Sequence, residues 1–178
     1  MKVNNLYLAQ PARRHRRAWH ALQDELTQAG DAKNFGLRGC KRFGQYLRMT
    51  RNHARGKALP QGLVSATTYF IMQRGNPKIL GTFNIRHELN DSLLNNPGGH
   101  IGYAIVPSER RKGYATEALR LGLQICKEMG ITRVLVTCNK ANTASANVII
   151  NNGGVLEDER PRPEDSSKLF QRYWIELT

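Results

Sequence analysis

The 178-residue sequence lacks several features that would assign it quickly to a class. It has no run of eighteen apolar residues, and its first ten residues lack the apolar core of a signal peptide, so we expect neither a membrane span nor secretion. Its three cysteines are an odd number without C-x-x-C spacing, which argues against a disulfide framework. Its five histidines show no zinc-ligand spacing. We therefore expect a cytoplasmic protein with reduced thiols and no bound metal.

Acidic residues are scarce in the first third of the chain. The whole sequence carries a net charge of +13, and residues 1–60 hold 13 Lys and Arg against 3 Asp and Glu. Residues 61–178 hold 14 Lys and Arg against 11 Asp and Glu, so most of the excess positive charge lies in residues 1–60. The excess is compatible with a solvated helix face, with binding of an anionic cofactor, or with an anionic partner such as RNA, a nucleotide or an acidic substrate. Because residues 13–57 contain no RNA-binding motif with aromatic residues interleaved in the basic clusters, nucleic acid is the minority interpretation.

Two common phosphate-binding fingerprints, G-x-G-x-x-G and G-x-x-x-x-G-K-[ST], are also absent. In their place, residues 101–116 predict a buried strand, a basic loop and the start of a helix, and contain R-x-x-G-x-A. Main-chain N–H groups at a helix start have no partner within the helix and lie at its positive end, so they form an anion site. Without a side chain, Gly113 lets a ligand approach the backbone. We predict phosphate contacts from Arg110, Arg111, Lys112, Gly113, Tyr114, Ala115 and Thr116.

The motif in isolation is equally compatible with a plain capped helix, but its context favours a ligand site. A helix with one apolar face follows it, and residues 133–139 then form a short β-branched run typical of a buried strand. Asn142 to Ser145 opens a second helical segment at 146–152, before Gly153. Elsewhere we predict helices over 11–29 and 41–55, strands over 67–72, 79–86, 100–106 and 168–177, and loops over 89–99 and 160–167.

This order of elements, with R-x-x-G-x-A at its centre, resembles motifs A and B of the GCN5-related N-acetyltransferases, the GNAT superfamily. Further segments look like a subgroup of predicted bacterial acetyltransferases in that superfamily. These segments are 83–90, 98–103, 152–157 and 172–175. The resemblance spans about residues 65–177 and implies an α/β (α+β) fold, with a mixed, mostly antiparallel sheet between helices. We expect a single domain over 1–178, with residues 1–60 as its basic helical part.

The resemblance also implies acetyl-CoA as the cofactor, held in a gap between two splayed strands. The edge of that gap would be Ala104, Ile105 and Val106, whose free N–H groups would bind the pantetheine and polarise the acetyl carbonyl. Asn142 and Ser145 match the family positions that lie near the pantetheine arm. Many members carry a tyrosine general acid seven residues after this Asn, where the present chain has Ile149. Ser145 is therefore a candidate to hydrogen-bond the leaving sulfur.

Attack by an amine on a thioester needs a base to neutralise the amine. His100 is the first candidate because it begins the strand that faces the cofactor, and imidazole exchanges protons near neutral pH. His87, at the end of the preceding strand, is the second, and Glu88 is the third. Each is also compatible with a residue that only satisfies a loop hydrogen bond.

We predict an acetyl-CoA-dependent N-acetyltransferase whose acceptor is an amine of a small molecule or a protein. The alternative is a binding protein on the same scaffold, either an acyl-CoA sensor or a basic module associated with RNA or the ribosome. Dimers are common in the superfamily, so a homodimer is compatible with the resemblance, although no residue of this sequence requires one.

Overall fold

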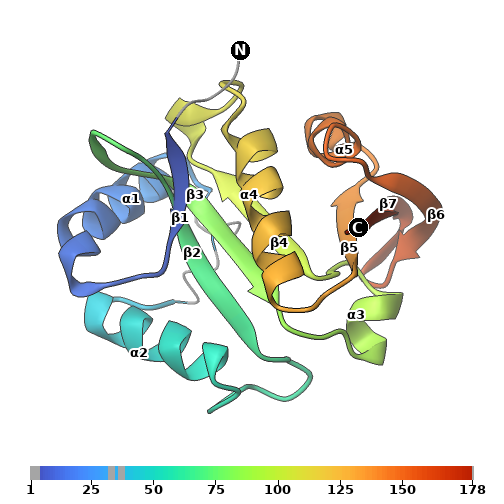
Figure 1. Cartoon of the computed structure of the whole chain (residues 1–178), viewed down its shortest axis with the longest axis horizontal. Helices are drawn as coiled ribbons and strands as arrows, with labels where there is room; N and C mark the ends of the chain where they lie inside the picture. The colour runs from blue at the N-terminus through green and yellow to red at the C-terminus, as the bar shows by residue number, and fades with distance from the viewer. Residues whose placement is uncertain (1–4, 32–34, 36–38, 178) are drawn as a thin grey trace.

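The structure is a computed structural model that describes residues 5–31, 35 and 39–177. Seven strands form one sheet in the order β1-β2-β3-β4-β5-β7-β6 (Figure 1). Neighbouring strands are antiparallel except β4 and β5, which run parallel and are joined by a crossover through α4. The predicted mixed, mostly antiparallel sheet is thus confirmed. The strands are β1 Leu6–Ala9, β2 Ala66–Gln73, β3 Asn76–Arg86, β4 Ile101–Ile105, β5 Arg133–Asn139, β6 Val155–Arg162 and β7 Asp165–Glu176.

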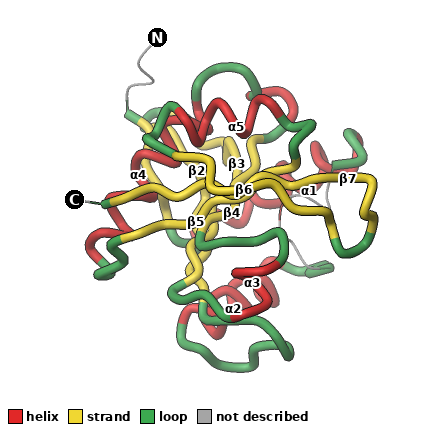
Figure 2. The backbone as a smooth tube through the Cα atoms, turned by 90° about the vertical axis from the view of Figure 1, so that its right-hand side faces the viewer, coloured by secondary structure: helices red, strands yellow, loops and turns green. Residues whose placement is uncertain are grey.

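Helices cover both faces of this sheet, and α5 and α2 lie on opposite sides of the strands (Figure 2). The first face carries α1 (Arg16–Gln28) and α2 (Phe43–Ala54), and the second carries α4 (Tyr114–Glu128) and α5 (Thr143–Ile150). Successive strand residues point to opposite faces, so β1 to β4 contribute to both apolar layers, whereas β5 and β7 contribute only to the layer under α4 and α5. In α1, residues at helical spacing are buried on the sheet, as their pattern predicts. These residues are Trp19, Leu22 and Leu26. No helix in the described ranges is long and apolar enough to cross a bilayer.

The sheet splits between β4 and β5. These two strands pair only through Ile101 and Val136 in the described part of the chain, whereas β4 stays paired with β3 along its length. At the point where they part, Gly99 has a φ of 69°, and a Cβ there would lie 2.4 Å from the carbonyl oxygen of Leu135. Only glycine fits this close approach, so the sequence itself helps to position the split.

The direction of the β4 amides corrects part of the prediction for this edge. The N–H of Arg86 donates to the carbonyl of His100 at 2.8 Å, and the N–H of Val106 donates to the carbonyl of Leu80 at 2.9 Å. Even-numbered residues of β4 therefore bond to β3, and odd-numbered ones face the split. The prediction of a free N–H at Val106 is therefore wrong. The alternating direction of successive amides along β4 also directs the N–H of Ala104 toward β3. The N–H of Ile105 faces the split between β4 and β5, as predicted.

Three elements differ from the predictions. β1 was not predicted, because four residues carry too little periodicity. A short helix, α3 (Asp91–Asn95), lies within the expected 89–99 loop and is capped by the side chain of Asn90, which accepts from the N–H of Leu93 at 3.0 Å. β6 was not predicted; it ends within the expected 160–167 loop, and β7 begins at Asp165, so only residues 163 and 164 stay outside the two strands. The charged sequence and the proline of β6 suit a sheet edge, where neither alternation nor a full hydrogen-bond ladder is needed.

Candidate active site

The loop before α4 has the backbone geometry of an anion site. Arg111 has a φ of 62° and Gly113 a φ of 83°, so left-handed residues alternate with Lys112 between them. The N–H of Glu117 is the first in α4 to reach a helical carbonyl, that of Gly113, at 3.2 Å. The three preceding amides therefore lie at the positive helix end without a partner from the helix. This arrangement fits the diphosphate of a cofactor.

The three basic side chains of the loop do not contribute equally. Arg110 forms an ion pair with Asp31 and donates from Nε to the carbonyl of Ile105 at 3.1 Å. Lys112 pairs with Glu109 at 2.8 Å. Arg111 has no ion-pair partner among the described residues. The predicted cluster of three cations thus reduces to one uncommitted guanidinium beside the main-chain amides.

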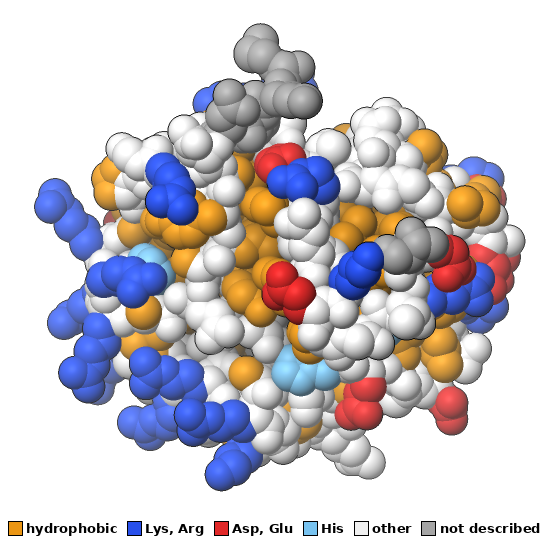
Figure 3. Space-filling model, viewed as in Figure 1, with side chains coloured by type: hydrophobic (Ala, Val, Ile, Leu, Met, Phe, Trp, Pro, Cys, Tyr) orange, Lys and Arg blue, Asp and Glu red, His pale blue; other side chains and the backbone are white. Residues whose placement is uncertain are grey.

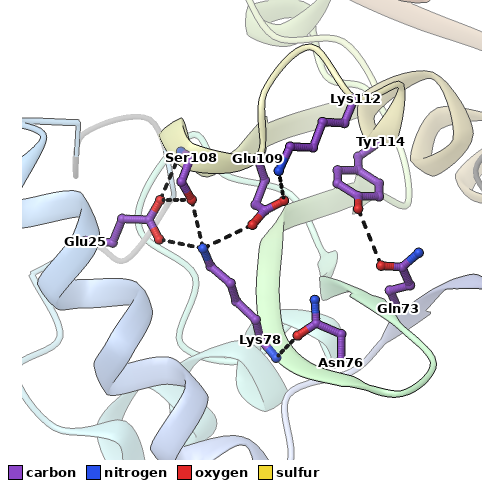
Figure 4. A network of polar contacts seen from close by, with 8 residues as sticks. All are labelled: Glu25, Gln73, Asn76, Lys78, Ser108, Glu109, Lys112 and Tyr114. Atoms are coloured by element: carbon purple, nitrogen blue, oxygen red, sulfur yellow. Dashed lines mark hydrogen bonds and ion pairs between the residues drawn. The ribbon is translucent and has the colours of Figure 1, made fainter.

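A polar network fixes this loop to α1 and β3 (Figure 4). The Nζ of Lys78, on β3, lies 3.1 Å from Glu25 of α1 and 3.3 Å from Glu109 of the loop. The hydroxyl of Ser108 donates to Glu25 at 2.8 Å. Hydrogen bonding to Lys112 is the first cause that lowers the pKa of the Glu109 carboxyl. The network holds the loop in place before any ligand binds.

A groove of about 730 Å³ extends from this loop between α4 and α5, and we call it the α4–α5 groove. The side chain of Asn142 caps α5 by accepting from the N–H of Ser145 at 3.0 Å, and both residues line the groove. Lys112 and Val106, which were predicted to bind the cofactor, are not among its lining residues. The predicted residues that line it are Ala104, Ile105, Arg110, Arg111, Gly113, Tyr114, Ala115, Thr116, Asn142 and Ser145.

Tyr103 of β4 occupies the side of the groove near the split. Its hydroxyl shares a hydrogen bond of 2.9 Å with the hydroxyl of Ser145, across 42 residues of sequence. Burial raises the pKa of Tyr103 to about 12. Ile149, at the position where many relatives carry tyrosine, is fully buried in the apolar core. A phenol is thus present at the groove, but it comes from a strand instead of from α5.

A second space of about 270 Å³ lies on the α2 side of the sheet, and we call it the inner α2 pocket. Its polar side chains include His53 of α2 and Asn84 of β3. No Asp or Glu occurs among its described lining residues. Tyr103 lines both this pocket and the α4–α5 groove. The full lining is Phe35, Met49, His53, Leu63, Val64, Ala66, Thr68, Thr82, Phe83, Asn84, Arg86, Leu93, Gly102 and Tyr103.

The predicted base candidates lie outside this lining. His100 is 8% exposed, and its Nδ1 accepts from the N–H of Leu135 at 3.0 Å. Burial and the nearby Arg86 lower its pKa to about 4, so its imidazole is neutral at pH 7. His87 shares a hydrogen bond of 2.8 Å with Thr67, and burial lowers its pKa as well. Glu88 is exposed. Their catalytic roles stay predictions.

Sequence reasoning did not select the two residues that the structure brings to the centre of the site, Tyr103 and His53. Tyr103 lay within a segment of the resemblance, but its side-chain direction follows from the β4 register. His53 lay within the predicted second helix, four residues after Met49. This spacing places the two side chains on one face of the helix, and it was the signal that could have identified His53. Cys126 and Cys138 are buried, and burial raises their pKa to about 12 and about 11, which suits inert core thiols.

The sheet splits between β4 and β5, and an anion-binding loop precedes α4. Together these two features are typical of acyltransferases that hold their cofactor in a split sheet. The model of the acetyltransferase (GNAT) domain matches residues 5–155, which is most of the chain and includes the basic part. The protein therefore belongs to the GNAT acetyltransferase family and is an acetyl-CoA-dependent N-acetyltransferase. The match starts well before residue 65, where the sequence resemblance was expected to begin.

Solved structures with the same fold have low sequence identity. The RimL ribosomal L7/L12 alpha-N-protein acetyltransferase in complex with coenzyme A is 18% identical, with a TM-score of 0.70, and the alignment covers 98% of this chain and 96% of RimL. The microcin C7 self-immunity acetyltransferase MccE, in complex with acetyl-CoA and AMP, is 18% identical, with a TM-score of 0.69 and coverage of 98% and 94%. A GNAT acetyltransferase from Bacillus anthracis is 21% identical, with a TM-score of 0.65 and coverage of 99% and 97%. Curated protein sequences gave no match.

Proposed function

We propose that acetyl-CoA binds in the α4–α5 groove and that a primary amine enters through the inner α2 pocket to take its acetyl group directly. The observation that carries this proposal is Tyr103, which lines both spaces and so marks where they adjoin. Acetyl-CoA or coenzyme A in two structural neighbours supports the choice of cofactor. Holding both reactants in line supplies much of the rate in such a transfer. A homodimer, a cytoplasmic location and nucleic-acid binding stay predictions.

The phosphate end of the cofactor fits the residues present. The partnerless amides before Glu117 and the guanidinium of Arg111 would hold the diphosphate, and the N–H groups of Tyr103 and Ile105 face the split where the pantetheine would lie. Bound acetyl-CoA supplies the acetyl group as a thioester. The N–H of Ile105 is the candidate to polarise the acetyl carbonyl.

We assign the base to His53. It is the imidazole among the described residues that line the inner α2 pocket, and imidazole exchanges protons near neutral pH. His100 was the first candidate from the sequence, but its Nδ1 is occupied by Leu135 and its low pKa makes it a weak base. His100 is better suited to holding the two strands in position at the split, because its imidazole connects the start of β4 to Leu135 of β5.

We assign stabilisation of the leaving sulfur to Tyr103. A thiol has a pKa of about 8.5, well below the value of about 12 for Tyr103. The phenol therefore keeps its proton and acts as a hydrogen-bond donor to the thiolate, and solvent supplies the proton that the thiolate finally takes up. Ser145 orients the phenol through their shared hydrogen bond. This pair replaces the tyrosine that is absent at position 149.

Replacing Tyr103 by Phe should lower kcat by a factor of about 10 to 100 while leaving the Kd for acetyl-CoA nearly unchanged. A hydrogen bond to a charged group contributes about 1.5–3 kcal/mol, and this one would form fully only when the sulfur becomes anionic. Steady-state kinetics and calorimetry measure the two quantities. Ser145→Ala is the matched control, and we expect a smaller loss because it removes only the orienting partner. An unchanged kcat in Tyr103→Phe would remove the phenol from the reaction.

The function itself is tested by release of free thiol from acetyl-CoA in the presence of small amines and peptides with free amino termini. We expect thiol release that depends on the acceptor, together with an acetylated product of the right mass. Tight acetyl-CoA binding without release for any acceptor would refute the enzyme and support an acyl-CoA sensor on this scaffold.

A further inference from the structure

The first third of the chain presents an unneutralised basic face beside the inner α2 pocket. All ten of its residues are exposed, and none forms an ion pair within the described part of the chain. Lys and Arg side chains gather on the side of the molecule that carries α1 and α2 (Figure 3). The basic face consists of Arg13, Arg14, Arg16, Arg17, Lys41, Arg42, Arg48, Arg51, Arg55 and Lys57.

The few acidic residues of this region do not neutralise it. Glu25 pairs with Lys78, and Asp31 pairs with Arg110. Both carboxylates therefore serve the loop before α4. Asp24 has no ion pair with any described residue. The charge of the basic face is thus left for an external partner or for solvent.

On α2 the arginines form a ridge. Arg48, Arg51 and Arg55 follow one another at spacings of three and four residues and share one exposed flank of the helix, beside the face that packs on the sheet. Like charges at these spacings slightly destabilise a helix. The repulsion within the ridge has a small cost for folding, which the position of Arg51 and Arg55 at the carboxyl end of α2 partly offsets.

Two neighbouring pockets with shared lining residues lie between the reaction site and this ridge. A further pocket of about 230 Å³, which we call the outer α2 pocket, is lined by Gln45, Arg48, Met49, Asn52, His53 and Ala58. It shares Met49 and His53 with the inner α2 pocket. The two pockets together run from Tyr103 across the flank of α2 to Arg48. An extended chain advances about 3.3–3.6 Å per residue, so a few residues suffice to leave the inner pocket and reach the ridge.

We propose that the acceptor is the amino terminus of an acidic polypeptide. Its α-amine occupies the inner α2 pocket, and its next residues run through the outer α2 pocket to place carboxylates against Arg48, Arg51 and Arg55. The inference rests on the proposed function. The amine nitrogen forms a bond to the acetyl carbon as the carbon–sulfur bond breaks. The attacking amine is neutral because its ammonium form has already given one proton to solvent; the second proton, lost as the amide forms, goes to His53, and coenzyme A leaves as a thiolate that solvent protonates.

The same charges do not favour nucleic acid as the occupant. Proteins that bind single strands combine basic grooves with exposed aromatic rings on which the bases stack. Among the described residues, the exposed large apolar side chains are Met129, Ile150, Val155 and Leu156, none of them aromatic and none on α1 or α2. The basic face thus offers charge without stacking platforms.

The test compares two peptides of about nine residues that share their first two residues and continue with Asp and Glu or with Lys. We expect kcat/KM, measured by thiol release, to be roughly tenfold higher for the acidic peptide, since three exposed ion pairs each contribute a small factor. The preference should weaken in about 0.5 M salt, where surface charges are screened. The triple variant R48E/R51E/R55E should lose or reverse the preference, and the matched variant R48K/R51K/R55K should keep it.

Acetyl-CoA affinity, measured by calorimetry, checks that both triple variants are folded. Equal kcat/KM for the two peptides in the wild-type protein would overturn the acidic-peptide inference while leaving the acetyltransferase intact. RNA retained at low salt and lost from R48E/R51E/R55E, without any preference between the peptides, would overturn it in favour of nucleic acid. Absence of thiol release with every peptide and every small amine would instead refute the proposed function.

Discussion

Replacing Gly113 by Asp should raise the Kd for acetyl-CoA by at least about a hundredfold. Gly113 has a φ of 83° directly before the first residue of α4, so any side chain added there stands beside the amides proposed to hold the diphosphate. Two unit charges about 4 Å apart interact by about 4 kcal/mol at an effective dielectric constant of 20, and about 2.7 kcal/mol corresponds to a hundredfold. The carboxylate would also accept from those amides itself. Calorimetric titration with acetyl-CoA measures the effect.

A second substitution separates charge from shape. Asn matches Asp in size and tolerates the left-handed region, but it carries no charge. We expect Gly113→Asn to weaken binding much less than Gly113→Asp. Both residues are good helix N-caps, so α4 should stay folded in both variants, which circular dichroism checks. Unchanged affinity in Gly113→Asp would show that the diphosphate does not bind at this loop.

Replacing His53 by Gln should lower kcat for acetyl transfer by a factor of about 10² to 10⁴, the usual contribution of a general base. Gln is similar in length and polarity but does not take up a proton at ordinary pH, so the amine would lose its proton acceptor. Affinity for acetyl-CoA should change little, because His53 lines the inner α2 pocket and not the α4–α5 groove. Single-turnover kinetics with saturating acetyl-CoA measures the chemical step.

The pH–rate profile distinguishes His53 from His100. A base works only when unprotonated, so the rate falls as the pH drops through its pKa. With a pKa of about 4, His100 would place this acid limb near pH 4. His100→Asn is the control, because its amide oxygen can still accept from the N–H of Leu135. An acid limb near pH 4 that disappears in His100→Asn, with His53→Gln fully active, would restore His100 as the base.

Elements that depend on local chemistry were predictable from the sequence. The R-x-x-G-x-A loop, the start of α4 next to Gly113, and the buried face of α1 all follow from backbone sterics and short-range periodicity. The same reasoning located Asn142 as the residue that opens α5, because a side-chain cap acts within one turn. Edge elements such as β1 and β6 were missed because their pairing partners, and not their own composition, make them strands.

The sequence alone thus indicated the resemblance to the family, the R-x-x-G-x-A loop and most of the helices and strands, because motifs and periodicity are encoded by residues close together in the chain. The tertiary structure alone decided which side chains meet. It placed Tyr103 against Ser145, paired Arg110 with Asp31, and brought His53 of α2 to a pocket whose lining includes residues of β2, β3 and β4. Such meetings depend on strand register and on the path of the chain between distant segments, and a shift of one residue in register would turn each strand side chain to the opposite face.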